Sequence, residues 1–261
     1  MSAAKPTFVL APGAWHKETC YSPAQQILES RGYPVEAVAY PSGLNDDAAA
    51  VRAVLERLAD EGKEIVLVVH SYGGLVGANA VKGLGYKQRA KEGKKGGVIT
   101  FVYLTAFVVP AGKCIREMLG GQFLPWMKIE SWAVTNCKRK GNYVHALTPE
   151  EVFYHDVEPE TQKKAIEALQ HQSAVVFDDV VTYEPWHDID SMYFFCDDDK
   201  AIPLVVQQNM AGLLGPNAIT YSSKASHSPF LSKPEDVAEG WRSPPRLGRR
   251  ESGLKAGFLG R

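Results

Sequence analysis

The sequence predicts an α/β fold in which helices cover both faces of a mostly parallel sheet of about six strands. Short apolar runs, typical of buried parallel strands, recur along the chain, as in IVLVV at residues 65–69. Stretches with the apolar spacing of helices separate these runs. This alternation implies right-handed crossovers between parallel strands, and 261 residues suffice for one large domain of this kind.

The expected elements follow one another through most of the chain. Strands are expected at residues 7–11, 35–40, 65–69, 98–105, 192–196 and 218–222. Helices are expected near residues 22–31, 46–61, 74–84 and 204–214. Together they assign residues 1–106 and 191–239 to the two parts of one core domain.

The alternation breaks between residues 107 and 190, and we interpret this segment as a helical lid inserted between two strands. Ligands of open parallel sheets bind at the carboxyl ends of the strands, where such a lid would lie. The candidate substrate contacts are aromatic: Phe123, Trp126 and Trp132 in the insertion, and Trp15 after the first strand. They favour an uncharged, partly apolar or aromatic substrate, although aromatic side chains of the insertion could equally form its own small core.

The last segment, residues 240–261, is rich in Gly, Pro and Arg and lacks helical periodicity. We expect it to be disordered or weakly packed. An altered reading frame or splice junction is a second interpretation of this tail.

Composition narrows the class of partner. A net charge of −1 gives no electrostatic reason to bind nucleic acid or an anionic membrane, so we expect a small-molecule substrate. The four cysteines are widely spaced and form no C-x-x-C pair, which is typical of reduced thiols rather than of a metal site or disulfide framework. The N-terminus lacks the apolar run of a signal peptide. We therefore expect a cytoplasmic protein without metal or organic cofactor, and a homodimer is left open.

Ser71 is the candidate nucleophile, in the segment VVHSYGGLVG. It lies between a predicted strand and a predicted helix, so the turn that carries it must be very tight. This is the arrangement of the G-x-S-x-G nucleophile elbow, in which the strained turn exposes the serine oxygen near a helix N-terminus. Val69 replaces the first glycine of that motif. The alternative role of Ser71 is to cap the helix.

The partners of a serine nucleophile are a base and an acid that orients the base. His227 follows the last predicted strand and Asp199 follows the strand before it, which is the chain order of the α/β-hydrolase triad. Asp197 and Asp198 adjoin Asp199, and we favour Asp199 because it lies deepest in the loop and begins DKAIP. His227 could otherwise be an ordinary loop histidine.

The oxyanion hole is expected to use two backbone N–H groups. One belongs to Tyr72, directly after the nucleophile, and the other to Ala14 in the loop after the first strand. Gly13 permits the close backbone approach that this loop needs.

The segments FVLAPGAWH, VVHSYGGLVG, CDDDKAIPLVVQQNM and ASHSPFLSKPEDV together resemble cofactor-free α/β-hydrolases. The branch is that of plant methylesterases and hydroxynitrile lyases, with their bacterial and fungal esterase relatives. The resemblance spans most of the chain up to about residue 237. It implies the α/β-hydrolase fold and places the acid at Asp199 and the base 28 residues later at His227.

Ester hydrolysis through an acyl-enzyme on Ser71 is the function that these observations favour. Hydrolysis of a carbon–carbon bond in a β-diketone, or a releasing or cyclising step on a polyketide-like metabolite, is the main alternative. The resemblance makes a hydroxynitrile lyase less favoured, because those enzymes carry threonine at the position of Gly13 and lysine at that of Ser228. A ligand receptor without turnover is the alternative from another class of protein.

Overall fold

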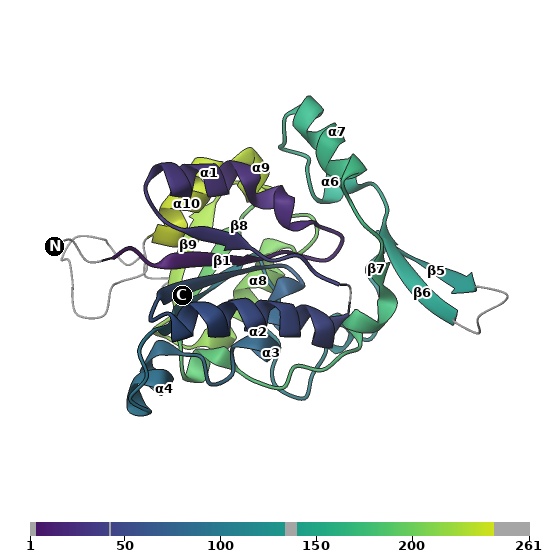
Figure 1. Ribbon diagram of the computed structural model, residues 1–261. Coiled ribbons are helices and arrows are strands. Elements are labelled where there is room, and N and C mark those ends of the chain that lie inside the picture. The colour runs from purple at the N-terminus through teal and green to yellow at the C-terminus, as the bar shows by residue number, and fades with distance from the viewer. Residues whose placement is uncertain (1–3, 42, 134–139, 243–261) are drawn as a thin grey trace.

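A computed structural model describes residues 4–41, 43–133 and 140–242 of the chain. A six-stranded parallel sheet runs through its centre in the order β2-β1-β3-β4-β8-β9 (Figure 1). The strands are β1 (Thr7–Ala11), β2 (Val35–Ala37), β3 (Glu64–His70), β4 (Gly97–Leu104), β8 (Asp190–Cys196) and β9 (Ile219–Ser223). The predicted fold class and its six strands are therefore confirmed.

Helices cover both faces of the sheet (Figure 1). One face carries α1 (Ser22–Ser30), α9 (Pro229–Ser232) and α10 (Pro234–Arg242). The other carries α2 (Leu44–Asp60), α3 (Gly73–Val81), α4 (Tyr86–Lys91) and α8 (Leu204–Ala211). Short 3-10 turns complete the core domain at η1 (Glu18–Tyr21) and η4 (Gly212–Leu214).

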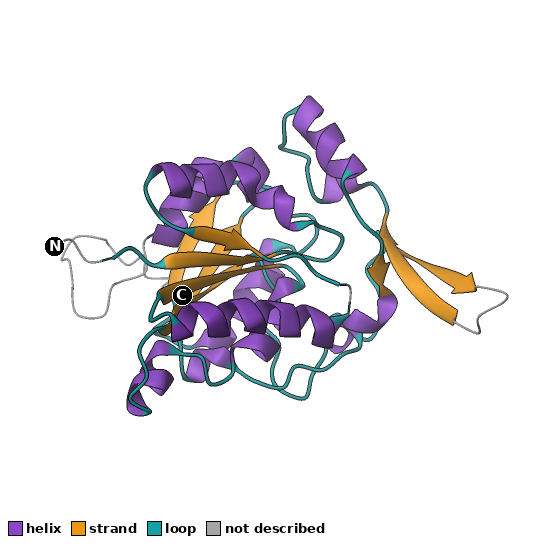
Figure 2. Ribbon diagram, in the orientation of Figure 1, coloured by secondary structure: helices purple, strands orange, loops and turns teal. Residues whose placement is uncertain are grey.

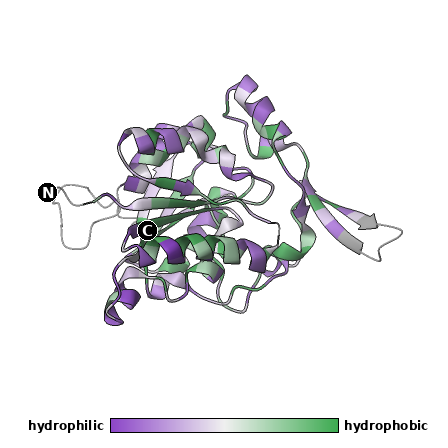
Figure 3. Ribbon diagram, in the orientation of Figure 1, coloured by the Kyte–Doolittle hydropathy of each residue, from purple (hydrophilic) through white to green (hydrophobic). Residues whose placement is uncertain are grey.

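Side chains of each strand alternate between two hydrophobic cores, one on each face of the sheet. In β1, Phe8 and Leu10 pack beneath α1 and α10, whereas Val9 and Ala11 pack on the side of α2 and α3. All four are buried, which explains why residues 8–11 of this strand are all apolar. Figure 3 shows this hydrophobic character along the central strands and hydrophilic residues over α4.

The insertion between β4 and β8 is only partly helical, which corrects the expectation of a helical lid. It contains a three-stranded antiparallel sheet in the order β5-β6-β7, and its β5–β6 hairpin projects from the body of the molecule (Figure 2). In MKIE of β5, Met127 is buried whereas Ile129 is 44% exposed, so the alternation of apolar and polar residues does not form a buried face along this strand. The strands are β5 (Met127–Ala133), β6 (Lys140–Ala146) and β7 (Gln172–Ser173); the helices are α5 (Ile115–Met118), α6 (Pro149–Val152) and α7 (Pro159–Glu167), with 3-10 turns η2 (Ala174–Phe177) and η3 (Pro185–His187).

Helix α10 continues to Arg242, so the first three residues of the expected tail belong to a helix. The reason is Trp241, which is fully buried and whose ring contacts those of Phe8 and Tyr21. The rest of the expected tail, residues 243–261, lies outside the described residues. Within the described ranges, no helix combines the length and apolar character needed to cross a membrane.

Candidate active site

Ser71 occupies a strained turn between β3 and α3. Its φ angle is 53°, in the left-handed region that non-glycine residues rarely adopt. The turn packs tightly against neighbouring backbone: a Cβ at Gly73 would lie 2.7 Å from the carbonyl oxygen of Ala11, and one at Gly74 only 2.1 Å from that of Phe107. Both positions therefore require glycine, as in the nucleophile elbow.

Val69 fits beneath the elbow because α3 provides the missing space. An added Cβ at Gly77 would lie 2.5 Å from Val69 Cγ1 and 2.9 Å from Cζ of Phe101. The valine at position 69, where the motif has glycine, is thus accommodated because Gly77, about one helical turn after the elbow, has no side chain. The departure from the motif leaves the strand–turn–helix geometry intact.

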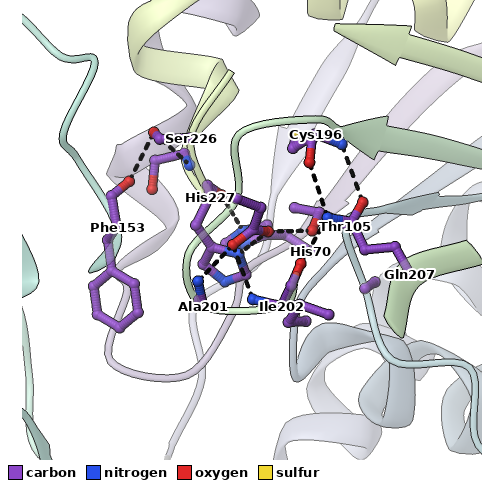
Figure 4. A network of polar contacts seen from close by, with 12 residues as sticks. His70, Thr105, Phe153, Cys196, Ala201, Ile202, Gln207, Ser226 and His227 are labelled. Atoms are coloured by element: carbon purple, nitrogen blue, oxygen red, sulfur yellow. Dashed lines mark hydrogen bonds and ion pairs between the residues drawn. The ribbon is translucent and has the colours of Figure 1, made fainter. Parts of the chain in front are cut away.

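The Asp199 carboxylate accepts hydrogen bonds from His227 and from three further donors. Figure 4 shows His227 together with the residues that supply these donors, Thr105, Ala201 and Ile202. The Oδ2 atom of Asp199 accepts hydrogen bonds from Nδ1 of His227 at 2.7 Å and from the hydroxyl of Thr105. Its Oδ1 accepts from the backbone N–H groups of Ala201 and Ile202, at 2.7 and 2.9 Å. Four donors fix the carboxylate, so that it orients the imidazole with Nε2 free for proton transfer.

The two neighbouring carboxylates face outward. Asp197 and Asp198 are exposed, whereas Asp199 is 6% exposed. The side chain of Asp197 accepts a hydrogen bond from Ser222 on β9. The structure therefore brings only the favoured aspartate of the three against His227.

Two backbone N–H groups are available where an oxyanion would form. The Ala14 and Tyr72 N–H groups donate to no described residue, and both are buried. The Tyr72 side chain is fixed by its hydroxyl, which donates to Asp47 Oδ2 of α2 at 2.9 Å. Two unused donors beside a nucleophile suit the developing negative charge of a tetrahedral intermediate.

The site is largely screened from bulk water, with Ser71 7% and His227 2% exposed. Within the described part of the chain, the Ser71 hydroxyl has no hydrogen-bond partner in this structure, and such catalytic contacts often tighten only when substrate binds. No group of three or more described His, Cys, Asp or Glu side chains is placed to bind a metal ion.

Two further histidines adjoin the triad, and the sequence interpretation did not include them. His70 donates from Nε2 to the carbonyl oxygen of His227 at 2.8 Å, which supports the loop that carries the base. His16 donates from Nδ1 to the Ala14 carbonyl, and its Nε2 accepts from the Tyr154 hydroxyl at 2.9 Å. Burial lowers the pKa of His16 to about 4 and that of His70 well below its usual range, so both rings are neutral at pH 7.

The insertion contacts the catalytic loop directly. The hydroxyl of Ser226 donates to the carbonyl oxygen of Phe153, and its backbone N–H donates to Asp156. The Phe153 ring lies 5.6 Å from that of His227, centroid to centroid. Phe153 therefore packs against His227 from the insertion, a contact that the sequence interpretation did not assign.

Trp15 connects the core to the insertion. Its indole N–H donates to the Val144 carbonyl of β6 at 2.6 Å, and its ring contacts those of Trp126, Phe153 and Phe177. Phe123 contacts Phe177 within the insertion. The side chain of Trp132 lies outside the described residues, although its backbone pairs in β5. One aromatic cluster therefore contains Trp15, Trp126 and Phe123. This packing fits the alternative in which aromatic side chains of the insertion form a small core.

A parallel sheet with a serine, histidine and aspartate at its carboxyl edge is the arrangement of α/β hydrolases. Residues 8–240 match the alpha/beta hydrolase family, and the chain belongs to it. Alpha/beta hydrolase nvfD of Aspergillus novofumigatus is 30% identical over 243 residues, which cover 89% of this chain and 94% of that protein. Methylesterase 1 of Arabidopsis thaliana is 23% identical over 259 residues, which cover 90% and 94%. Polyneuridine aldehyde esterase has a similar structure, with a TM-score of 0.75 at 18% identity over 92% of this chain and 98% of that one.

These comparisons confirm the family expected from the sequence. By its family, the chain is an α/β hydrolase, and some of its relatives are named esterases.

Proposed function

We propose that the protein hydrolyses a carboxylic ester of a small molecule through an acyl-enzyme on Ser71. One observation carries this proposal: Asp199, fixed by four donors, accepts from Nδ1 of His227, while Ser71 lies in a strained elbow and the backbone N–H groups of Ala14 and Tyr72 donate to no described residue. The esterase names of the relatives agree with it. Gly13 and Ser228 also fit an esterase better than a lyase, because Ser228 is a buried neutral side chain that offers no cation to a leaving cyanide.

In the proposed reaction, Ser71 Oγ attacks the ester carbonyl carbon while Nε2 of His227 takes its proton. The carbonyl oxygen becomes an oxyanion, which accepts hydrogen bonds from the N–H groups of Ala14 and Tyr72. The imidazolium returns the proton to the departing alcohol. Water then attacks the acyl-enzyme with His227 as general base, and the acid leaves as Ser71 regains its proton.

Steady-state hydrolysis of p-nitrophenyl butanoate by wild type and variants tests this proposal. Ser71→Ala should lower kcat/KM by about 10⁴-fold or more. Asp199→Asn should lower it by about 10³-fold, because an amide in place of the carboxylate favours the wrong tautomer of His227. Ser222→Ala and Asp198→Asn are the matched controls and should retain wild-type activity. Full activity of Ser71→Ala would contradict the proposal.

A further inference from the structure

A small cavity adjoins the loop that carries the proposed oxyanion hole. Its volume is about 20 Å³, and it lies between Gly13, Trp15, His16 and Tyr40 of the core and residues 170–172 of the insertion. Two of these residues flank Ala14 in the chain. The Tyr40 ring contacts that of Tyr72, with 6.3 Å between centroids. The cavity therefore borders the loop of Ala14 directly, and only the Tyr40 ring links it to Tyr72.

Two of the residues that line this cavity have buried polar atoms without a partner. The Tyr40 hydroxyl and Nε2 of Gln172 are shielded from solvent, and neither forms a hydrogen bond with any described residue. Gln172 is only 5% exposed as a whole. Folded proteins rarely leave such atoms unpaired, because a buried polar group without a partner is unfavourable. Both residues line the cavity, and each offers an unpaired polar group beside it.

The orientation of the Gln172 amide follows from its other contact. The backbone N–H of Trp15 donates to Oε1 at 3.3 Å, and a donor can face only the oxygen of the amide. Nε2 is therefore the unpaired atom and is a donor. Backbone pairing of Gln172 with Val144 of β6 holds the residue in place.

Tyr40 offers a second donor. Burial raises the pKa of its hydroxyl well above the usual range, so the group stays protonated. Two neutral donors suit an uncharged acceptor oxygen. A cavity of about 20 Å³ has room for one group the size of a water molecule.

We propose that this cavity binds a carbonyl or hydroxyl oxygen carried by the acyl group of the substrate. The inference rests on the proposed ester hydrolysis, since it places the acyl group at the oxyanion loop. It narrows the substrates to esters of oxo or hydroxy acids, in which a second oxygen lies a short distance from the scissile carbonyl. A plain alkanoic ester would leave both donors unpaired and should bind more weakly.

Calorimetric binding to Ser71→Ala protein tests the proposal without requiring turnover. The probes are methyl lactate, methyl acetoacetate and methyl levulinate, each paired with the methyl ester of the alkanoic acid of equal chain length. At least one oxygenated ester should bind about tenfold more tightly than its plain counterpart. Adding Tyr40→Phe or Gln172→Met should remove most of that difference. Tyr40→Phe breaks no hydrogen bond with a described residue, so it tests the site with the least disturbance of the fold.

Tyr103→Phe is the matched control, because it removes another buried tyrosine hydroxyl without a described partner, in β4. It should leave the preference unchanged. The proposal is overturned if no oxygenated ester binds more tightly than its counterpart, in which case the cavity holds structural water only. It is also overturned if the preference survives in both Tyr40→Phe and Gln172→Met. Hydrolysis of the same esters by the protein with Ser71 is measured separately, so failure of the reaction is distinguished from failure of the binding site.

Discussion

Backbone strain among the described residues is concentrated around the site. Four described non-glycine residues have positive φ, and three of them belong to the proposed site. Ser71 is the proposed nucleophile, Trp15 follows Ala14 of the proposed oxyanion hole, and Thr105 donates to Asp199, the proposed acid. Such conformations cost on the order of 1–3 kcal/mol each and persist only where the surroundings enforce them. The tight packing of Gly73 and the hydrogen bonds of Asp199 are the enforcing contacts. Strain in this molecule therefore accompanies the placement of reactive groups.

We expect Thr105 to position Asp199, the proposed acid, because its hydroxyl donates to Oδ2 of Asp199. Thr105→Val removes one of the four donors to Asp199 while keeping the shape of the side chain. Hydrogen bonds to charged groups contribute about 1.5–3 kcal/mol, so kcat/KM for p-nitrophenyl butanoate should fall by about tenfold or more. Thr105→Ser keeps the donor and should stay within about twofold of wild type. Equal activity of both variants would show that this hydroxyl does not support the acid.

His16 should make stability depend on pH. Its pKa is lowered to about 4 in the folded protein and returns to about 6.5 on unfolding. Below pH 6.5 the unfolded chain takes up a proton that the folded chain does not, so stability falls as the pH falls from 6.5 toward 4. The loss from this residue should reach about 3 kcal/mol at pH 4.

Urea unfolding of wild type and His16→Gln at several pH values between 4 and 7 measures this loss. The variant should lose less stability over that interval, because it lacks the titrating ring. Parallel pH profiles for the two proteins would contradict the assignment. His70 remains in both proteins, and burial, the main cause of its lowered pKa, is common to both.

At the scale of elements, β3, the elbow and α3 form one packed unit. The strand is buried on both faces, and the helix approaches it closely because α3 contains Gly77 and small neighbours. Apolar β-branched side chains of the strand fill the space that these small residues leave. The stability of this unit therefore depends more on the fit between the side chains of β3 and the small residues of α3 than on helix propensity.

Gly77→Ala should destabilise the protein although alanine is the better helix former. The added Cβ would collide with Val69 and Phe101, and overpacking typically costs about 1–3 kcal/mol. In the double variant, Val69→Ala removes the nearer of the two colliding atoms and should restore part of the stability. Chemical denaturation of the four proteins of this cycle gives the coupling energy between positions 69 and 77. Additive effects would show that the two side chains do not share this space.

The sequence predicted the elements that carry strong local signals. The central strands β1, β3, β4 and β8 contain continuous apolar runs. Ser71, Asp199 and His227 lie at or shortly after the carboxyl ends of β3, β8 and β9, so their positions at one edge of the sheet could be inferred. The antiparallel sheet of the insertion was missed because its alternation is confined to a few residues of β5. Thr105 was missed because its role depends on a contact 94 residues away in the chain. The one feature of the sequence that could have pointed to Thr105 is its position directly after an apolar strand.

At the scale of the whole molecule, the insertion is fastened to the core beside the reactive groups. Trp15 contacts it through its indole N–H, its backbone and its ring, and the loop of His227 contacts it through Ser226. The loop of Ala14 and the loop of His227, which carry the proposed oxyanion donor and base, are thus both supported by the insertion. A displacement of the insertion from the core would disturb contacts of these same residues.

Trp15→Phe tests this coupling between core and insertion. The change keeps an aromatic ring but removes the donor to the Val144 carbonyl. Loss of a hydrogen bond worth about 1 kcal/mol should speed amide exchange in β6 and β7 by about fivefold, with β1 and β3 unchanged. Trp186→Phe, in η3, serves as the control. Unchanged exchange in the insertion would show that Trp15 does not hold it.

The most direct test of the central claim is to trap the acyl-enzyme. The protein is mixed with p-nitrophenyl acetate and quenched in acid during the first turnovers, and its peptides are analysed by mass spectrometry. The account predicts an acetyl group on the peptide that contains Ser71, and none on that peptide in Ser71→Ala. Sustained turnover with the acetyl group on another residue, or with no acetylated peptide even during the initial burst, would contradict the assignment of Ser71 as the nucleophile.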